Sequence, residues 1–229
     1  MLIVFFCGAL CSAASLSGYV QAAESLGFAT TVVVPNTNPF TANHARDLER
    51  MREAIARELE REQRASGKVP QLGFFAFSSG AKFAARIAQD TPVEGMFLLD
   101  PVDGPPPGSR PSERFPVFLD EADAAWRTLS TAPDAARKPA VLRILSTELG
   151  ERPGFTGTPC VTPAYGSGFF AERLGAQAAE RVDIDDSGHL DVLFQSAGLL
   201  GAVCPRGGNP DGARTQSLAG FQDFLARLP

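Results

Sequence analysis

The sequence predicts an α/β protein in which a mostly parallel β-sheet is covered by helices on both faces. Short apolar runs alternate along the 229 residues with longer segments of helical periodicity. Most of these runs are continuous Val, Ile, Leu and Phe, which is typical of strands buried on both faces of a parallel sheet. With 44% hydrophobic residues and no linker-like stretch, we expect a single domain over residues 1–229.

The first apolar run, Leu2–Phe6, is expected to be a strand. An apolar start followed by the small residues 12–14 also fits a secretory signal. However, the chain has no basic residue before this run, the run breaks at Gly8, and a helix-like segment follows at Leu16–Leu26. These features favour a strand, and no run approaches the ~20 apolar residues of a membrane span.

The next elements follow from periodicity. The β-branched run Ala29–Val34 predicts the second strand. Thr41–Gln63 predicts a long helix whose exposed side carries i,i+3 and i,i+4 charge pairs. Its buried stripe is expected to consist of Leu48, Met51, Ile55 and Leu59. Its role is therefore structural.

The rest of the chain repeats the alternation of strand and helix. Strands are expected at Leu72–Phe77, Met96–Leu99, Ala140–Leu145 and Arg181–Ile184, and helices at Ser79–Gln89, Asp120–Thr128 and Ser217–Leu228. A sheet of this kind places its active site at the carboxyl ends of its strands.

One strand-to-helix junction carries the first sign of chemistry. The apolar run Leu72–Phe77 meets Ser78 and then continues at helical spacing, with Ala76 two residues before the serine and Gly80 two residues after it. A strand that turns sharply into a helix at a serine flanked by small residues is the nucleophile elbow of α/β-hydrolases. Ala76 replaces the usual first glycine and weakens the match.

The order of two further residues strengthens this interpretation. Asp100 ends the apolar strand Met96–Leu99, and His189, one of two histidines, lies in a loop after the last predicted strand. Serine, then acid, then histidine is the chain order of this fold. We therefore expect Ser78 as nucleophile, Asp100 as acid and His189 as base.

Alternatives exist for the acid and the base. Asp103 lies three residues after Asp100, and Glu148 follows the next strand, where this fold also places acids. Asp191 is expected to cap a following helix. His44, at the start of a helix, is expected to be a surface or near-cap residue.

Ester hydrolysis by these residues would place the oxyanion on backbone N–H groups of Ala9 and Ser79. It would need no metal and no cofactor. Two loops rich in Pro and Gly, Pro101–Pro116 and Arg152–Gly168, could shape the substrate pocket. Phe side chains in or beside them would suit a long apolar chain, although they could equally be core: Phe115, Phe118, Phe155, Phe169 and Phe170.

Charge and cysteine content exclude other classes. The net charge is −5 and the basic residues are scattered, so we expect no nucleic-acid partner. The four cysteines include no C-x-x-C pair, so a structural zinc site is not expected. Free buried thiols are the expectation for all four, although Cys160 and Cys204 could pair.

Several short motifs together resemble chlorophyllases and their relatives. They are Asp100-Pro-Val-Asp-Gly104 with its preceding leucines, Ser187-Gly-His-Leu-Asp191, the Thr158-Pro-Cys160 turn and the closing Cys204-Pro-Arg-Gly-Gly208. The resemblance covers most of the chain and implies an α/β-hydrolase that cleaves the phytyl ester of chlorophyll, with the same Ser78, Asp100 and His189 in the catalytic roles. It departs from the family at the elbow and at Cys7-Gly8, where the family has His-Gly. Leu2–Phe6 corresponds to the third strand of the family, so we expect the N-terminal strands that precede it either to be missing or to lie upstream of Met1.

The substrate implied is a small lipophilic ester, with association to a membrane surface through that substrate. The resemblance implies a plastid location in a photosynthetic eukaryote and a cytoplasmic one otherwise. Two other functions fit the same residues: a lipase-like or polyester-type esterase, and a degenerate hydrolase that binds without catalysis.

Overall fold

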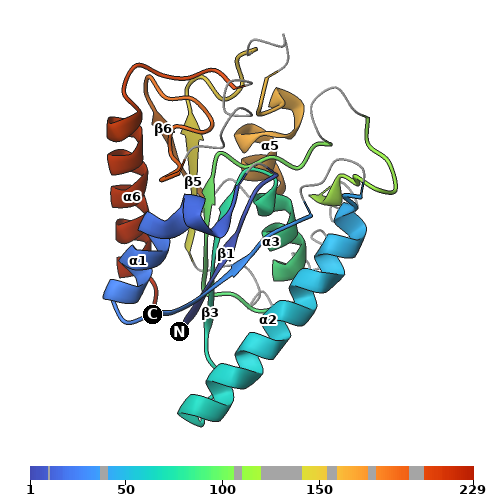
Figure 1. The fold of residues 1–229 in the computed structure, drawn as a ribbon, viewed down its shortest axis with the longest axis vertical. Coiled ribbons are helices and arrows are strands. Elements are labelled where there is room, and N and C mark those ends of the chain that lie inside the picture. The colour runs from blue at the N-terminus through green and yellow to red at the C-terminus, as the bar shows by residue number, and fades with distance from the viewer. Residues whose placement is uncertain are drawn as a thin grey trace.

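Six parallel strands form one sheet in the computed structural model, which describes residues 1–9, 11–36, 41–105, 110–119, 141–153, 159–174, 179–195 and 204–229 (Figure 1). The strand order is β2-β1-β3-β4-β5-β6. The strands are β1 (Leu2–Phe6), β2 (Ala29–Val33), β3 (Leu72–Phe77), β4 (Gly95–Leu99), β5 (Val141–Thr147) and β6 (Ala179–Ile184). The predicted α/β fold class is confirmed, and all six strands lie where the apolar runs place them.

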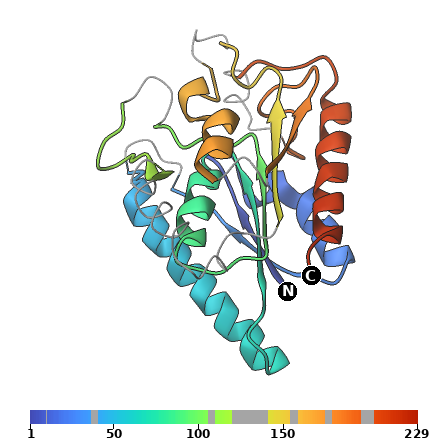
Figure 2. The ribbon, with the colours of Figure 1, turned by 180° about the vertical axis from the view of Figure 1, so that it is seen from behind.

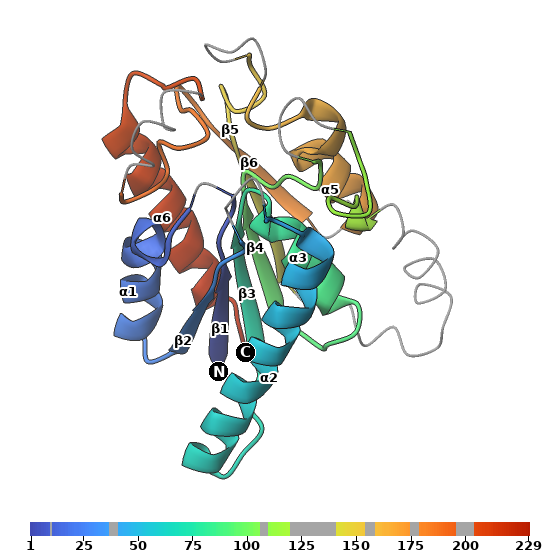
Figure 3. The same ribbon diagram turned by 45° about the vertical axis from the view of Figure 1, so that its right-hand side comes forward.

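Helices cover both faces of this sheet (Figure 3). α1 (Ser17–Ser25) and α6 (Pro210–Ala226) lie on one face, and α2 (His44–Ser66), α3 (Gly80–Ala88) and α5 (Ser167–Leu174) lie on the other. Two short 3-10 helices, Ala13–Leu16 and Pro163–Tyr165, precede α1 and α5. Both chain ends lie at the amino ends of the strands (Figure 2), so the carboxyl ends are left to the loops.

The strands are apolar throughout because successive side chains enter opposite cores. In β1, Val4 and Phe6 face the core under α2 and α3, while Ile3 and Phe5 face the core under α1 and α6. All five residues of β1 are buried. Continuous apolar runs are therefore required by the two-sided packing of a parallel sheet.

Helix boundaries follow capping residues that the periodicity alone does not show. α2 begins at His44, because the Asn43 side chain accepts a hydrogen bond from the backbone N–H of Arg46. α6 begins at Pro210, seven residues before the expected start, because Asn209 caps the helix and Pro210 fits its first turn. The helix α5 was not expected, and the one predicted at Asp120–Thr128 lies outside the described residues.

Two of the four cysteines form a disulfide, Cys160–Cys204, with 5.6 Å between their Cα atoms. The expectation of four free thiols is wrong for this pair. Cys7 and Cys11 are free and buried. The spacing in the sequence cannot identify such a pair, because the two cysteines are 44 residues apart and come together only when the loops that carry them have folded.

Removing this disulfide should lower stability. Closing a loop of this length restricts the unfolded chain by about 4 kcal/mol, so Cys160→Ala/Cys204→Ala should melt roughly 10 °C below the wild type. Differential scanning calorimetry of both proteins without reductant measures the difference. Equal melting temperatures would contradict the bond.

The helices within the described ranges are too short or too polar to cross a membrane. The longest of them, α2, carries charged residues along its exposed side.

Candidate active site

Ser78 lies at a sharp turn between β3 and α3. Its φ angle is 54°, in the left-handed region that residues with a side chain rarely adopt. The turn brings α3 so close to β1 that a Cβ added at Gly80 would lie 2.4 Å from the carbonyl oxygen of Phe6. Ala76 is fully buried, and its methyl group is accommodated in the core between the sheet and the helices α2 and α3. This is the geometry of the predicted elbow.

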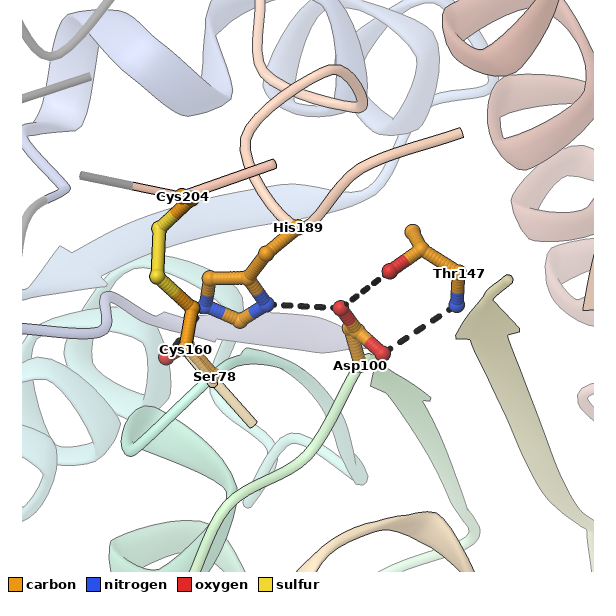
Figure 4. The surroundings of a disulfide bond; sticks show 6 residues. All are labelled: Ser78, Asp100, Thr147, Cys160, His189 and Cys204. Carbon is orange, nitrogen blue, oxygen red and sulfur yellow. Dashed lines mark hydrogen bonds and ion pairs between the residues drawn. A yellow bond between two sulfur atoms is a disulfide. The ribbon is translucent and has the colours of Figure 1, made fainter. Parts of the chain in front are cut away.

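Three side chains predicted from the sequence meet at this turn. The Ser78 Oγ lies 2.9 Å from His189 Nε2, and His189 Nδ1 lies 2.6 Å from Asp100 Oδ2 (Figure 4). All three residues are buried: Ser78 is 8% exposed, His189 is 4% exposed and Asp100 is 1% exposed. They come from the carboxyl ends of β3 and β4 and from the loop after β6, three segments far apart in the chain.

Asp100 is itself held by β5. Thr147 donates its backbone N–H to Asp100 Oδ1 at 3.1 Å and its hydroxyl to Oδ2 at 2.5 Å (Figure 4). Asp100 also has a positive φ of 49°. Thr147 was not predicted as a site residue, because the apolar run ends at Leu145. The available signal was a hydroxyl residue at the carboxyl end of the strand next to β4.

The other carboxylates named from the sequence are engaged elsewhere. Asp103 accepts the backbone N–H groups of Phe118 at 3.0 Å and Leu119 at 2.7 Å. Glu148 binds Arg152 and the backbone N–H of Asp186. The carboxylate that reaches His189 is Asp100.

The loop that carries His189 is shaped by Asp191. The Asp191 Oδ2 accepts the N–H groups of Gly188 at 2.8 Å and Gly207 at 2.7 Å, so the expectation that it caps a helix is wrong. The imidazole of His189 also stacks on the ring of Phe77 with 4.8 Å between centroids. Both contacts restrict the orientation of the imidazole.

The two predicted oxyanion donors lie on segments that flank Ser78. Ser79 follows it in the turn, and Ala9 lies in the turn after β1. A Cβ at the preceding Gly8 would lie 2.5 Å from the Ser78 Cβ, so the end of β1 is packed directly on the elbow. A role in stabilising an oxyanion stays a prediction.

Comparisons with known proteins bear on the fold. No family model matches the sequence, and no curated protein sequence matches it. Among solved structures, a protein from Xanthomonas campestris pv. campestris assigned to the alpha/beta hydrolase superfamily is 17% identical with a TM-score of 0.52, covering 99% of each chain. The chain has the α/β-hydrolase fold.

Two solved esterases have the same fold. Carboxyl esterase 2 of the mycorrhizal fungus Tuber melanosporum is 14% identical, with a TM-score of 0.57 over 100% of this chain and 79% of that chain. A thermostable esterase from Pseudomonas putida is 14% identical, with a TM-score of 0.53 over 100% and 74%. At this identity the likeness concerns the fold, and none of these comparisons supports chlorophyllases in particular.

Of the Phe side chains that the sequence allowed either to line a pocket or to belong to the core, two belong to the core. Phe118 and Phe170 are buried in the core beneath α2, α3 and α5, so they do not form a rim. Phe170 is buried because it lies on the side of α5 that packs against the sheet. Phe115 and Phe169 are half-buried, against His44 and Tyr165 respectively. Phe155 lies outside the described residues.

His44 is the first residue of α2, next to the Asn43 cap, so the near-cap alternative is confirmed, but the residue is buried and a surface position is wrong. Its ring packs edge-on against Phe83 at 5.3 Å and Phe115 at 4.8 Å. Burial, together with the positive charge of Lys82, lowers the pKa of His44 from its ordinary 6.5 to about 3. The residue is therefore neutral in the folded protein near neutral pH.

The titration of His44 should make stability depend on pH. Its folded pKa lies below its unfolded value, so the unfolded chain binds the proton first and the folded state loses stability as pH falls from ~6.5 towards ~3. The slope would be at most about 1.4 kcal/mol per pH unit. Urea unfolding at pH 7, 5.5 and 4 should show a steeper loss for the wild type than for His44→Phe, and parallel losses would contradict the assignment.

Lys82 is a buried cation on α3, four residues after Ser78. Its Nζ donates to the carbonyl oxygens of Pro116 at 3.1 Å and Gly104 at 3.5 Å. Burial lowers its pKa to about 8, against the opposing charge of Asp103. These hydrogen bonds connect α3, the helix that follows the elbow, to the loop after β4, which begins with Asp100.

In the part of the chain that the structure describes, no three side chains of His, Cys, Asp and Glu come together as a metal site would require.

Proposed function

We propose that this chain is a serine carboxylic-ester hydrolase that works through an acyl-enzyme. The observation that carries the proposal is the buried chain of hydrogen bonds from Ser78 through His189 to Asp100, with its serine on a left-handed elbow. The fold alone would not suffice, since one fold supports many functions. The α/β-hydrolase fold and the esterases that share it support the proposal.

In the first half of the reaction, His189 Nε2 accepts the Ser78 proton as Oγ attacks the ester carbonyl carbon. The C=O bond becomes a C–O⁻ bond, and the N–H groups of Ala9 and Ser79 would stabilise its charge. His189 then returns the proton to the alcohol oxygen, the ester C–O bond breaks, and an acyl-Ser78 remains.

In the second half, water replaces the alcohol. His189 accepts a proton from water, the oxygen attacks the acyl carbon, and the proton returns to Ser78 as the acid leaves. Asp100 accepts the Nδ1–H throughout, which keeps Nε2 unprotonated before each attack. Thr147 fixes Asp100 for this task through two hydrogen bonds.

For the substrate, the first candidate is a lipophilic ester of the kind that general esterases and lipases hydrolyse. The second is the phytyl ester of chlorophyll, which is favoured by the motif at residues 100–104. That motif also has a structural explanation here, since Asp103 binds two backbone N–H groups and Asp100 binds Thr147. The esterase candidate is therefore preferred.

A fluorophosphonate probe tests the catalytic proposal. The purified chain should be labelled at Ser78, and peptide mass spectrometry should locate the adduct. Absence of labelling under native conditions would favour a binding protein that has lost catalysis.

Substrate assays test the class of ester. Rates on p-nitrophenyl esters of two to sixteen carbons should be compared with rates on chlorophyll and pheophytin. Hydrolysis of the simple esters, with little release of chlorophyllide, is expected; kcat/KM higher on the pigments would favour the chlorophyllase candidate.

A further inference from the structure

The segment 204–208 packs backbone against backbone on the loop that carries His189. A Cβ added at Gly188 would lie 1.9 Å from the carbonyl oxygen of Pro205, and one at Gly207 would lie 1.7 Å from that of Asp186. Two backbone segments can approach each other this closely only where a glycine, which has no Cβ, leaves the space. Any shift of the segment would therefore be transmitted to the residues on both sides of His189.

Hydrogen bonds join the same two stretches. The Asp191 carboxylate accepts one N–H from each of them, from Gly188 and from Gly207. The Gly208 N–H donates to Asp186 at 3.0 Å. The segment therefore completes the hydrogen bonding that gives the histidine loop its shape.

Cys160 is linked through its neighbour in the chain to the turn that supports Asp100. Its neighbour Val161 donates its N–H to the carbonyl oxygen of Gly150 at 2.9 Å. Gly150 belongs to the turn that begins at Thr147, and Leu149 in this turn donates to Ser187 of the histidine loop at 2.9 Å. Cys160 is thus anchored to the residues that hold the acid.

The disulfide joins these two supports and lies beside the side chains of Ser78 and His189 (Figure 4). We infer that the Cys160–Cys204 disulfide is a positioning element for His189, so that the oxidised protein turns over esters at least tenfold faster than the reduced one. The inference rests on the proposed function, since His189 must act as a base for its position to matter. A displacement of about 1 Å at a catalytic group can cost on the order of 100-fold in rate.

The redox step needs a dithiol reductant. The S–S bond accepts two electrons and two protons from the two thiols of the reductant, Cys160 and Cys204 become thiols, and the reductant leaves as a disulfide. Thiols are kept reduced in the cytosol of most cells and paired outside it. The enzyme would therefore be fully active in an oxidising compartment and slow in a reducing one.

Steady-state kinetics at 25 °C test the inference on the wild type and on Cys160→Ala/Cys204→Ala, each with and without dithiothreitol. The wild type should lose at least tenfold in kcat with little change in KM on reduction and recover on reoxidation. The double variant should be equally slow under both conditions. This variant controls for effects of the reductant at Cys7 and Cys11.

Two further measurements separate positioning from stability. Circular dichroism at 25 °C should show the reduced wild type folded, and proton NMR should show a loss of the low-field signal of the His189–Asp100 hydrogen bond. A lower melting temperature with unchanged kcat and an unchanged signal would overturn the inference and leave the disulfide a stabilising bond only.

A second variant covers the case in which the double variant does not fold. Asp191→Ala removes the oxygen that accepts both N–H groups without touching the disulfide, and it should lower kcat with little change in KM. An unchanged kcat in this variant would overturn the inference as well. Failure of the oxidised wild type to label at Ser78 is a different outcome, because it would remove the proposed function, and the inference with it.

Discussion

Replacing Ser78 with alanine is expected to reduce kcat for ester hydrolysis by about 10⁶-fold, the scale seen when the nucleophile of a serine hydrolase is removed. The change deletes the attacking oxygen and the hydrogen bond to His189 Nε2 at 2.9 Å. It removes little volume, so the fold should be retained. Initial rates on a p-nitrophenyl ester, with circular dichroism of both proteins, measure the two effects separately.

A matched control is Ser66→Ala, at the end of α2, where the hydroxyl binds the local backbone carbonyls of Glu62 and Lys68. That variant should hydrolyse the ester like the wild type. If Ser78→Ala kept activity within tenfold of the wild type, a loss of only about 1.4 kcal/mol in transition-state stabilisation, Ser78 would not be the nucleophile.

The strands were predictable because their composition has a single physical cause. Both faces of β1, β3 and β4 are buried, so nearly every side chain in them must be apolar. The approach of Ser78, Asp100 and His189 was predictable for a similar reason, since the carboxyl ends of parallel strands share one edge.

What the sequence did not reveal depends on contacts between distant segments. The burial of His44 arises because Phe83 and Phe115 close over the start of α2. The pairing of Cys160 with Cys204 requires the histidine loop and the turn after β5 to be in place. The hydrogen bonds of Thr147 depend on the register of β4 with β5, in which Leu99 pairs with Leu145. The burial of His44 and the cysteine pairing leave no periodic or local pattern, and for Thr147 the only signal is a hydroxyl residue at the end of a strand.

Asp100→Asn should lower kcat by about 10⁴-fold, the cost of the wrong histidine tautomer when a triad acid is neutralised. Oδ1 accepts the Thr147 N–H, whereas Oδ2 accepts His189 and the rotatable Thr147 hydroxyl. If the NH₂ of the asparagine took the Oδ1 position, it would face the backbone N–H of Thr147, another donor. The NH₂ should therefore occupy the Oδ2 position. There it donates to Nδ1, which moves the imidazole proton to Nε2 and leaves no acceptor for Ser78.

The matched variants are Asp103→Asn and Glu148→Gln, the other two carboxylates that follow these strands. Asp103→Asn should lower thermal stability, because an amide can accept only one of the two N–H groups of Phe118 and Leu119 well. Its effect on kcat should be far smaller than that of Asp100→Asn, and Glu148→Gln should resemble the wild type because its contacts lie at the surface. A severe loss of kcat in either variant, with a mild one in Asp100→Asn, would transfer the role of the acid to that residue.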